Sequence, residues 1–557
     1  MAATGALVVC TLLSALRIVV ALRPNPTVHN LWPGDSASKP TDVSVIPQPA
    51  FATQRSGGPW RTTGLSVDGQ ADSLLNASQN LLGIASTLFN ITRGVPIAAE
   101  GDMPLRLKLQ PELHDEHGIA GLPDEMYHLE TSKQGIDIEA RTEHGLFNGL
   151  MTLRQLITAN PGKGGVNEWM VPSVKVIDGP AFEWRGMMLD VSRHFFPAEE
   201  VKRLLTLMSL FKLNHFHWHL SDDHGWRLPV DAWPDLTRVG QWRNGSPEST
   251  DAAKRTSGSE RYGGAYTRDE IRDVVEHAAS LFIEVVPEVG FPGHAQAAIA
   301  SYPELGNTDV EKWSTPDVAT VWGLVSNYTL APKANTFQFI RDVIDEEALQ
   351  FPHSSHIHLG GDEVTPFQWE LSSLARDFAQ SMGISALTSM APLQSVFQAA
   401  GVMRAEEHGR RAIVWDDAAQ RDHHLNESAI VMAWRIFNEH GVLESTMHDL
   451  TGRGYDVVLC PWYYAYLDMD PVSTLDLQRS YSMPMPQPQS AARGRVLGGQ
   501  AQLWTEHIGN RMKLESQAWP RGMALAERFW QGGSAAPSFQ DFKRRLVPRL
   551  VELKAMG

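Results

Sequence analysis

The sequence predicts an α/β protein in which a (β/α)8 barrel of the TIM type follows a small α+β accessory domain. Three observations predict this architecture. Short apolar strands alternate with helices after Pro180, helix and strand patterns mix before it, and polar or aromatic residues follow the later strands. We therefore divide the chain into a signal peptide or N-terminal anchor (1–22), a lead-in with the accessory domain (23–180), and the barrel (181–557).

The first segment carries a short apolar run, GALVVCTLLSAL, followed by Arg17 and the proline-containing RPNP. This pattern predicts entry into the secretory pathway, with a secreted, lysosomal or vacuolar, or membrane-anchored product. N-glycosylation tripeptides fit that route, and they begin at Asn76, Asn90, Asn327 and Asn426. Residues 23–60 are rich in Pro, Ser, Gly and Thr and are expected to form a lead-in without regular structure.

The accessory domain is predicted from four patterns. SLLNASQNLLGIASTLFNIT has apolar residues at helical spacing, and PLRLKLQ alternates as a strand does. YHLETSKQGIDIEAR indicates two strands joined at Lys133–Gly135, and NGLMTLRQLIT indicates a second helix. Together they give a small domain that mixes helices and strands.

The barrel is predicted from eight strands, near 183–190, 214–220, 282–288, 355–360, 412–415, 430–434, 456–460 and 496–502. Helices are expected between most of them, for example at 198–211, 268–280, 337–348 and 386–407. A doubly wound open sheet is the structural alternative, but no glycine-rich dinucleotide turn follows the first strand.

Composition excludes several classes of partner and chemistry. Lys plus Arg is 48 and Asp plus Glu is 64, giving a net charge of −16, which argues against a nucleic-acid or anionic-membrane partner. The two cysteines cannot build a disulfide framework or a zinc finger. Seventeen Trp residues are a surplus of flat apolar rings, as expected of proteins that stack on sugars.

The most specific local pattern is Gly360-Gly361-Asp362-Glu363, directly after the fourth barrel strand. Catalytic residues of such barrels lie at the carboxyl ends of the strands. Adjacent like charges raise at least one pKa, as a general acid requires, whereas a solvated acidic turn is the alternative interpretation.

His215, His217 and His219 alternate along the second strand and face one side of it. Such histidines also begin the site of metal-dependent amidohydrolases, our second enzyme hypothesis, which needs further His ligands at later strand ends. Strands five, six and eight offer Trp and Glu instead. We therefore expect no metal and no cofactor, and we expect His215 and His217 to fill the barrel interior.

Six ordered motifs carry a resemblance to a known family: EWRGMMLDVSRHF, NHFHWHLSDDHGWR, VPEVGFPGHA, HLGGDEV, LWTE and WPRGMALAERFW. Together they resemble the family 20 glycoside hydrolases, the β-N-acetylhexosaminidases, over roughly residues 180–530. VIPQPA and GLFNGLMTLRQL look like the accessory domain of that family. The resemblance implies exo-acting release of terminal, non-reducing β-linked GlcNAc or GalNAc from glycoconjugates or chitooligosaccharides. It also implies retention of configuration, with the 2-acetamido oxygen of the substrate as nucleophile and an oxazolinium intermediate.

The resemblance also implies residue roles. Glu363 would be the general acid and later the base, Asp362 would bind the acetamido N–H and stabilise the cation, and Tyr466 would hold the acetamido oxygen. The residues implied to bind the sugar are Arg185 at O3 and O4, the aromatic wall of Trp415, Trp434 and Trp504, and Asp468 with Glu506 at O4 and O6. Those implied to support the catalytic residues from behind are Asp222, His294, Asp190, His219 and Glu288.

Two departures from the family pattern matter. Gly290 stands where the family carries an Asp, which puts the role of His294 in doubt, and Tyr463 or Tyr464 could replace Tyr466. A sugar-binding protein on an inactive scaffold is the non-enzymatic hypothesis, although Glu363 and Asp362 are both present. Pairing into a homodimer is a further expectation, and the natural glycan is left open.

Overall fold

The computed structural model describes residues 43–67, 77–97, 101–114, 122–161, 167–244, 261–310, 317–318, 326–385, 389–420, 425–435, 441–487, 493–533 and 538–556. The chain separates into two compact units, residues 1–42 and residues 43–557, and all elements below belong to the second. The predicted signal peptide or anchor, the first part of the lead-in and Asn76 lie outside the described residues. Within the described ranges, we find no helix with the length and hydropathy needed to cross a membrane.

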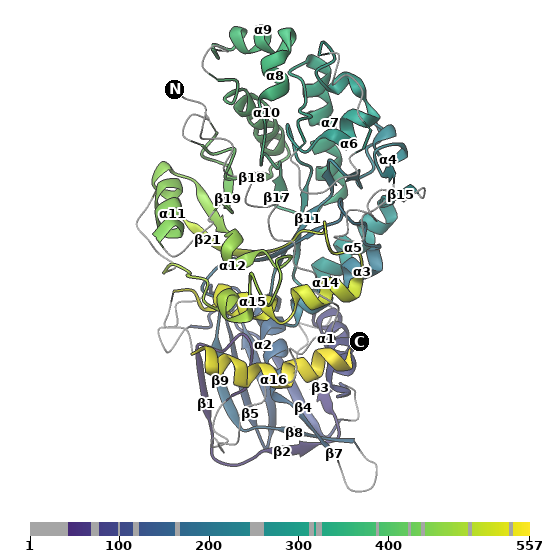
Figure 1. Ribbon diagram of the computed structural model, residues 1–557. Coiled ribbons are helices and arrows are strands. Elements are labelled where there is room, and N and C mark those ends of the chain that lie inside the picture. The colour runs from purple at the N-terminus through teal and green to yellow at the C-terminus, as the bar shows by residue number, and fades with distance from the viewer. Residues whose placement is uncertain are drawn as a thin grey trace. The chain divides into compact units, whose positions relative to one another are not determined.

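The accessory domain is built on a six-stranded sheet in the order β1-β9-β5-β6-β4-β3 (Figure 1). Its strands are β1 (Phe51–Gln54), β3 (Leu65–Val67), β4 (Met103–Leu109), β5 (Tyr127–Ser132), β6 (Gly135–Ala140) and β9 (Val174–Asp178). Helix α2 (Glu143–Leu156) packs on β5 and β6, and α1 (Ala77–Arg93) packs on α2. A second sheet joins β2 (Trp60–Thr62), β8 (Asn167–Val171) and β7 (Thr158–Pro161). The hairpin predicted around Lys133–Gly135 is confirmed, because Ser132 pairs with Gly135.

Eight parallel strands then close into a barrel, in the order β10-β11-β16-β17-β18-β19-β20-β21. They are β10 (Trp184–Asp190), β11 (His215–His219), β16 (Glu284–Glu288), β17 (His356–His358), β18 (Arg411–Trp415), β19 (Ile430–Ala433), β20 (Asp456–Leu459) and β21 (Val496–Leu503). The predicted barrel is confirmed, and each strand end lies within two residues of its predicted place. The open-sheet alternative is wrong, because β21 pairs with β10 and closes the sheet.

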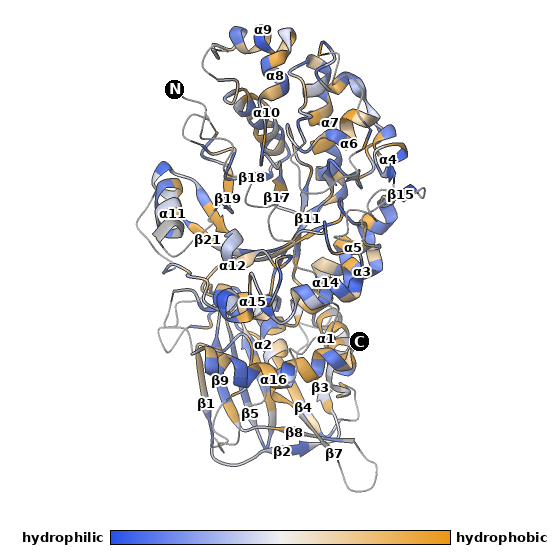
Figure 2. Ribbon diagram, viewed as in Figure 1, coloured by the Kyte–Doolittle hydropathy of each residue, from blue (hydrophilic) through white to orange (hydrophobic). Residues whose placement is uncertain are grey.

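The barrel strands are buried on both faces, as parallel strands covered by helices must be. Every residue of β10, β11 and β19 is buried, and Figure 2 shows the hydrophobic residues along β19. Two buried clusters result. The larger one lies between strands and helices, and the smaller one, which includes Trp184, Ile413 and Trp415, fills the barrel interior.

Helices follow the strands around the outside of the barrel. They are α3 (Ala198–Ser209), α5 (Arg268–Ser280), α7 (Ala334–Gln350), α10 (Leu393–Glu407), α11 (Gly441–Arg453) and α15 (Arg521–Gln531). Helix α10 begins seven residues later than predicted, directly after Pro392, and proline is favoured at a helix start. Shorter elements lie in the connections: β12 (Ser221–Asp222), β13 (Gly225–Trp226), α4 (Asp235–Arg238), β14 (Trp242–Asn244), β15 (Arg261–Gly263), α6 (Gln296–Ser301), η2 (Pro303–Leu305), α8 (Phe367–Leu371), α9 (Ser373–Ser381), α12 (Trp462–Ala465), α13 (Leu477–Tyr481) and α14 (Arg511–Ala518).

Buried ion pairs join the accessory domain to the amino-terminal end of the barrel. Arg185, the second residue of β10, forms a two-pronged pair with Glu125, at 3.1 and 2.5 Å. Lys212 Nζ lies 3.3 Å from Asp178 Oδ2. The last helix, α16 (Phe539–Ala555), packs against α1, and its Glu552 pairs with Arg154 of α2. The accessory domain is therefore fixed to both the first strand and the last helix of the barrel.

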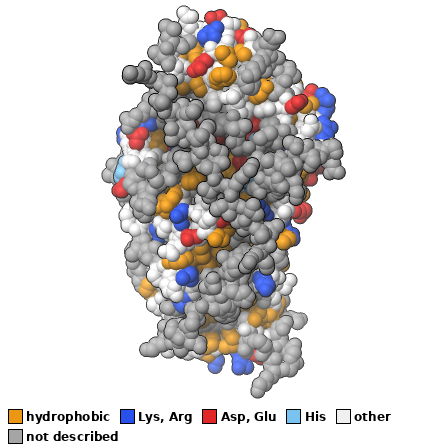
Figure 3. All heavy atoms as spheres, in the orientation of Figure 1, with side chains coloured by type: hydrophobic (Ala, Val, Ile, Leu, Met, Phe, Trp, Pro, Cys, Tyr) orange, Lys and Arg blue, Asp and Glu red, His pale blue; other side chains and the backbone are white. Residues whose placement is uncertain are grey.

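Exposed hydrophobic side chains gather on α8, α9 and the turn that follows, where Phe367, Leu371, Leu374 and Met382 are each about half exposed. In Figure 3, hydrophobic side chains are visible at the surface in the upper part of the molecule, where Figure 1 places α8 and α9. This surface follows directly in the chain after the Gly360–Glu363 turn.

Candidate active site

The turn after β17 has a backbone that only particular residues can adopt. Gly360 and Gly361 have φ values of 64° and 93°, and Glu363 itself has φ of 50°. A Cβ on Gly360 would lie 2.6 Å from the Cα of Gly290, and one on Gly361 would lie 2.7 Å from Gln398 Nε2. Positive φ at a residue that is not glycine marks strain, which is often held at functional sites. The turn thus presents Asp362 and Glu363 at the carboxyl end of the barrel.

His294 links this turn to a second group of carboxylates. Its Nε2 lies 3.5 Å from an oxygen of Asp362 and 3.5 Å from an oxygen of Glu363. On the other side of the ring, Nδ1 lies 3.1 Å from Asp223 and 3.4 Å from Asp222. One imidazole therefore contacts four carboxylates.

These contacts set the charges of the site. Burial raises the pKa of Asp362 to about 7, and the charges of Glu288, Glu363 and Asp417 add to this effect. The hydrogen bond from His294 lowers the pKa of Glu363. The pKa of His294 is raised well above its usual value because the charges of Asp222 and Asp362 outweigh the cost of burial. The raised pKa therefore belongs to Asp362 and not, as the sequence suggested, to the general acid, and the imidazole of His294 is charged.

Gly290 does not leave His294 without support. A Cβ at this position would have no atom within 4 Å, so a side chain there would extend into open space. Asp222 and Asp223 already bind the Nδ1 side of the ring. The doubt that Gly290 raised about His294 is thus answered by two neighbouring carboxylates from the loop after β11.

Asp222 is the centre of the charge network. It accepts from Arg193 at 2.9 Å and from His219 at 3.2 Å, and its pKa lies well below the usual value because Arg193 and His294 overcome the cost of burial. Arg193 also contacts Asp190 at 3.2 Å and lies over the ring of Trp504, 5.1 Å from its centroid.

Arg185 does not belong to this site, so that prediction was wrong. It lies at the amino end of β10, fully buried, and its guanidinium is occupied by Glu125 and by the carbonyls of Phe182 and Lys212. Sequence reasoning missed Arg193, which follows Asp190 in the loop after the same strand. The rule that barrel chemistry gathers at the carboxyl ends of strands could have identified it.

Glu288 forms the floor of the site at the end of β16. It accepts a hydrogen bond from Trp415 Nε1 at 2.8 Å, lies 2.8 Å from His217 Nε2, and makes a short contact with His219. This carboxylate is fully buried, and its pKa lies well below the usual value because the surrounding histidines, first among them His219, outweigh the cost of burial. It thus orients the side chains of Trp415, His217 and His219.

An aromatic wall stands beside the turn. The ring centroids of Trp415 and Trp504 are 6.0 Å apart, and Tyr466 lies 6.2 Å from both Trp504 and Trp434. Trp434 donates to Asp417 at 2.7 Å. By contrast, Tyr463 packs under Arg479, with the guanidinium 4.4 Å from its ring centroid. Of the candidate tyrosines, the structure brings Tyr466 to the tryptophans.

Asp468 and Glu506 lie at the edge of this wall. Burial and the charge of Glu506 raise the pKa of Asp468 well above its usual value. Within the described part of the chain, the Oδ1 atom of Asp468 has no hydrogen-bond partner. Glu506 is about one-third exposed and lies 4.0 Å from Arg193. A buried acceptor without a partner beside an open aromatic wall is suited to bind a polar ligand.

Asp222, Asp223 and His294 are close enough to hold a metal ion, but Arg193 and the charged His294 already neutralise these carboxylates. The arrangement instead offers two carboxylates and a shared proton beside an apolar wall, which suits general acid and base chemistry on a sugar.

Comparisons with known proteins identify a family for both domains. The model of the catalytic domain of glycosyl hydrolase family 20 matches residues 182–533, and that of domain 2 of the same family matches residues 42–179. A β-hexosaminidase from Porphyromonas gingivalis is 34% identical over 539 residues, which are 92% of this chain and 64% of the relative. The chain thus spans less than two thirds of that relative's length.

Two solved structures are similar over most of the chain. The exo β-N-acetylglucosaminidase from Vibrio harveyi, in complex with N-acetylglucosamine, has a TM-score of 0.76 at 27% identity and covers 94% of this chain and 79% of its own. The β-N-acetylhexosaminidase from Streptomyces coelicolor has a TM-score of 0.73 at 30% identity and covers 93% of this chain and 98% of its own.

Proposed function

The chain belongs to glycosyl hydrolase family 20, and from this membership we propose that it is an exo-acting β-N-acetylhexosaminidase. It releases terminal, non-reducing β-linked N-acetylhexosamine from oligosaccharides or glycoconjugates. The names of the similar proteins support this activity. The observation that carries the proposal is the Asp362–Glu363 pair, held by a strained turn against one histidine and beside an aromatic wall.

The arrangement of the two carboxylates favours assistance by the substrate. The two residues are adjacent in the chain and approach the same nitrogen of His294, each at 3.5 Å, which supports one acid and one stabiliser over two opposed carboxylates. Ordinary retaining glycosidases place a nucleophilic carboxylate opposite the acid, about 5–5.5 Å away. Here the 2-acetamido oxygen of the substrate attacks C1 and gives an oxazolinium ion, with retention of configuration after water adds.

The two carboxylates have different catalytic roles. Glu363 protonates the departing oxygen and later takes a proton from the attacking water. Asp362 accepts a hydrogen bond from the acetamido N–H and stabilises the developing cation, while Tyr466 holds the acetamido oxygen. Burial raises the pKa of Asp362 in the free protein. When the substrate binds, its acetamido N–H donates to Asp362 and favours the carboxylate form, so the proton released by Asp362 moves to Glu363.

The remaining side chains bind and enclose the sugar. Trp415, Trp434 and Trp504 surround the acetamido group and the sugar face and exclude water, so that the charges act at full strength. Arg193 takes the role that the sequence gave to Arg185, as the cation that binds sugar hydroxyls. Glu506 and the unpaired oxygen of Asp468 accept from further hydroxyls.

A series of substrates tests this mechanism. An aryl 2-acetamido-2-deoxy-β-glucoside should be cleaved with retention, whereas the matching β-glucoside with a hydroxyl at C2 should be nearly inert. Replacing acetamido hydrogens by one, two and three fluorines weakens the oxygen as a nucleophile, so kcat/KM should fall stepwise. A flat series, or a glycosyl group trapped on a protein carboxylate, would reject substrate assistance in favour of a conventional two-carboxylate glycosidase.

Two further expectations stay predictions. Entry into the secretory pathway is tested by expressing the full chain and sequencing the amino terminus of the exported protein. Pairing into a homodimer is tested by sedimentation equilibrium. Assays with paired GlcNAc and GalNAc glycosides, and with chitooligosaccharides, N-glycans and glycolipids, assign the natural glycan.

A further inference from the structure

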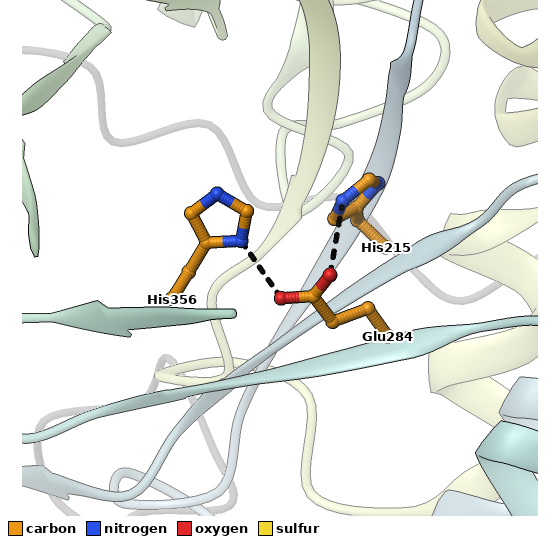
Figure 4. Close-up of side chains that lie close together, drawn as sticks. All are labelled: His215, Glu284 and His356. Atoms are coloured by element: carbon orange, nitrogen blue, oxygen red, sulfur yellow. Dashed lines mark hydrogen bonds and ion pairs between the residues drawn. The ribbon is translucent and has the colours of Figure 1, made fainter. Parts of the chain in front are cut away.

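Three side chains converge at the amino ends of adjacent barrel strands, at the opposite end from the candidate active site. His215, Glu284 and His356 are the first residues of β11, β16 and β17. Figure 4 shows the carboxylate of Glu284 between the two imidazoles. Glu284 Oε1 lies 2.7 Å from His356 Nδ1, and Oε2 lies 3.8 Å from His215 Nε2. One donor atom from each residue lies within 4.8 Å of the other two.

The imidazole of His215 is oriented as a metal ligand usually is. The amide of Asn214 is fixed, because its Oδ1 accepts from the Arg185 N–H at 3.0 Å and its Nδ2 donates to the carbonyl of Glu183 at 2.9 Å. The same Oδ1 lies 2.8 Å from His215 Nδ1, which must therefore carry the hydrogen. The lone pair of the neutral ring is then on Nε2, which faces Glu284. Such a hydrogen bond behind the ring is typical of histidine ligands.

Packing and exposure also suit an ion. The ring of Trp184 stacks on His215 at a centroid distance of 3.9 Å and holds it in place. Ser355 donates its backbone N–H to Glu284 at 2.7 Å and orients the carboxylate. The side chains of His215, Glu284 and His356 are 11%, 20% and 17% exposed, so solvent reaches the cluster although it is largely enclosed.

We propose that His215 Nε2, His356 Nδ1 and the carboxylate of Glu284 bind a divalent transition-metal ion of the zinc class. Two histidines and one carboxylate are a known zinc ligand set, with water in the remaining position. Ligands about 2.1 Å from a tetrahedral ion lie about 3.4 Å apart, so the 3.8 Å Oε2–Nε2 pair closes by a few tenths of an ångström and the 2.7 Å Oε1–Nδ1 pair opens. The hydrogen on His356 Nδ1 moves to Nε2, which leaves the Nδ1 lone pair for the ion.

Two further groups of this kind lie within the described ranges, and they fit an ion less well. The His217, Glu288 and His358 side chains are completely buried, and Glu288 already accepts from Trp415 and His219. Asp222, Asp223 and His294 belong to the active site, where Arg193 supplies the positive charge. The His215 group combines partial exposure with a carboxylate that lies between two imidazoles.

The position of the ion determines its role. Four residue steps separate His215 from His219 along β11, roughly 13 Å at about 3.3 Å per residue. The ion therefore does not touch a sugar bound at the other end of the barrel. By binding only the folded protein, it stabilises three neighbouring strands, two of which carry Glu288 and the catalytic turn at their other ends. Metal should raise Tm and leave kcat unchanged.

The experiment uses the full chain, stripped with a chelator and then titrated with ZnCl₂ or CoCl₂. We expect one equivalent of Zn²⁺ by calorimetry, a rise in Tm, and visible absorption bands of a Co²⁺ complex of low coordination number. His215→Gln and His356→Gln should each weaken Zn²⁺ binding by more than about 100-fold. Removing a residue that only hydrogen-bonds a metal ligand costs about 10–100-fold, so a larger loss identifies a ligand. The matched control is His353→Gln, which removes an exposed histidine 3.0 Å from Glu276 and should change nothing.

Two measurements distinguish loss of the metal site from loss of folding. Circular dichroism and hexosaminidase activity of the metal-free variants show whether they fold, and His356→Gln is the safer of the two because that side chain is the more exposed. The absence of a stoichiometric site in the parent overturns the proposal and leaves a hydrogen-bonded His–Glu–His cluster. Unchanged Zn²⁺ binding in a folded His356→Gln variant places the ion elsewhere and overturns it equally. Neither result depends on which glycoside the protein cleaves.

Discussion

At the scale of single residues, His294 balances the charge of the candidate active site. Buried carboxylates are costly unless they are paired, and this imidazole contacts Asp222 and Asp223 through one nitrogen and Asp362 and Glu363 through the other. Because Arg193 binds the other oxygen of Asp222, two cations lie among these carboxylates. Because burial raises the pKa of Asp362 to about 7, protonation of this carboxyl removes a further negative charge at lower pH.

Replacing the general acid tests the role of Glu363. Glu363→Gln should fold normally and lose about 10²–10⁴-fold in kcat on natural oligosaccharides, because the departing oxygen then lacks a proton. Activated aryl glycosides should suffer less, since their leaving group departs without help. Steady-state kinetics on both substrate classes measure the difference, with Glu370→Gln in α8 as the control. Parent-like turnover of an oligosaccharide by the variant would remove Glu363 from this role.

Asp362 gives a second prediction, which concerns stability. Burial raises its pKa to about 7 in the folded protein, against about 3.9 in an unfolded chain. Between these values the folded state binds more protons, so this residue makes the protein less stable as the pH rises. Asp362→Asn cannot ionise and should raise Tm at pH 8 but hardly at pH 4, while slowing catalysis. Calorimetry measures the Tm of the parent and the variant between pH 4 and pH 8. A gain in Tm that does not depend on pH would contradict the assigned pKa.

At the scale of elements, the turn after β17 is held by close contact between two glycines. Gly360→Ala would place a Cβ 2.6 Å from the Cα of Gly290 at a φ of 64°. We expect a loss of stability above the roughly 1–2 kcal/mol that a left-handed backbone costs alone, together with loss of activity as Glu363 is displaced.

Gly383 provides the matched control for this substitution. It has a φ of 77°, but a Cβ there would meet no atom within 4 Å. Gly383→Ala should therefore show the backbone cost and keep its activity. Chemical denaturation and kcat of both variants separate strain from collision, and equal effects in the two would show that the contact with Gly290 is unimportant.

The elements were predictable because their signals are local. Eight short apolar segments separated by helical patterns define the barrel, and buried parallel strands give such segments. The role of a side chain at a given position along a strand is not predictable from such local signals. Arg185 lies near the start of strand β10 and Arg193 follows its end. Both are arginines near acidic residues, so residue type alone does not distinguish a domain contact from a sugar ligand. The raised pKa of Asp362 depends mainly on burial, which the sequence does not contain.

At the scale of the whole molecule, the Arg185–Glu125 pair connects the two domains. Arg185→Met should destabilise the protein by about 3–5 kcal/mol, because it leaves a buried carboxylate without its arginine. The double variant with Glu125→Leu should recover part of the loss. Chemical denaturation measures both, and the exposed Arg55–Glu130 pair is the control, since Arg55→Gln should cost below about 1 kcal/mol. The folded fraction should retain its KM, and a large rise in KM would return Arg185 to the sugar site.

The contact between the first and last described segments has a consequence for biosynthesis. The carbonyl of Val45 accepts a hydrogen bond from Arg545, 500 residues later, at 2.8 Å. At about 5–20 residues per second, a ribosome needs roughly 25–100 s to make the chain between them. During that interval α16 has not yet been made. The surface of the accessory domain that α16 later covers, which includes Arg154, is therefore exposed to water. Chaperones therefore have a defined target on the nascent chain, and a stalled ribosome exposes that target to quality control.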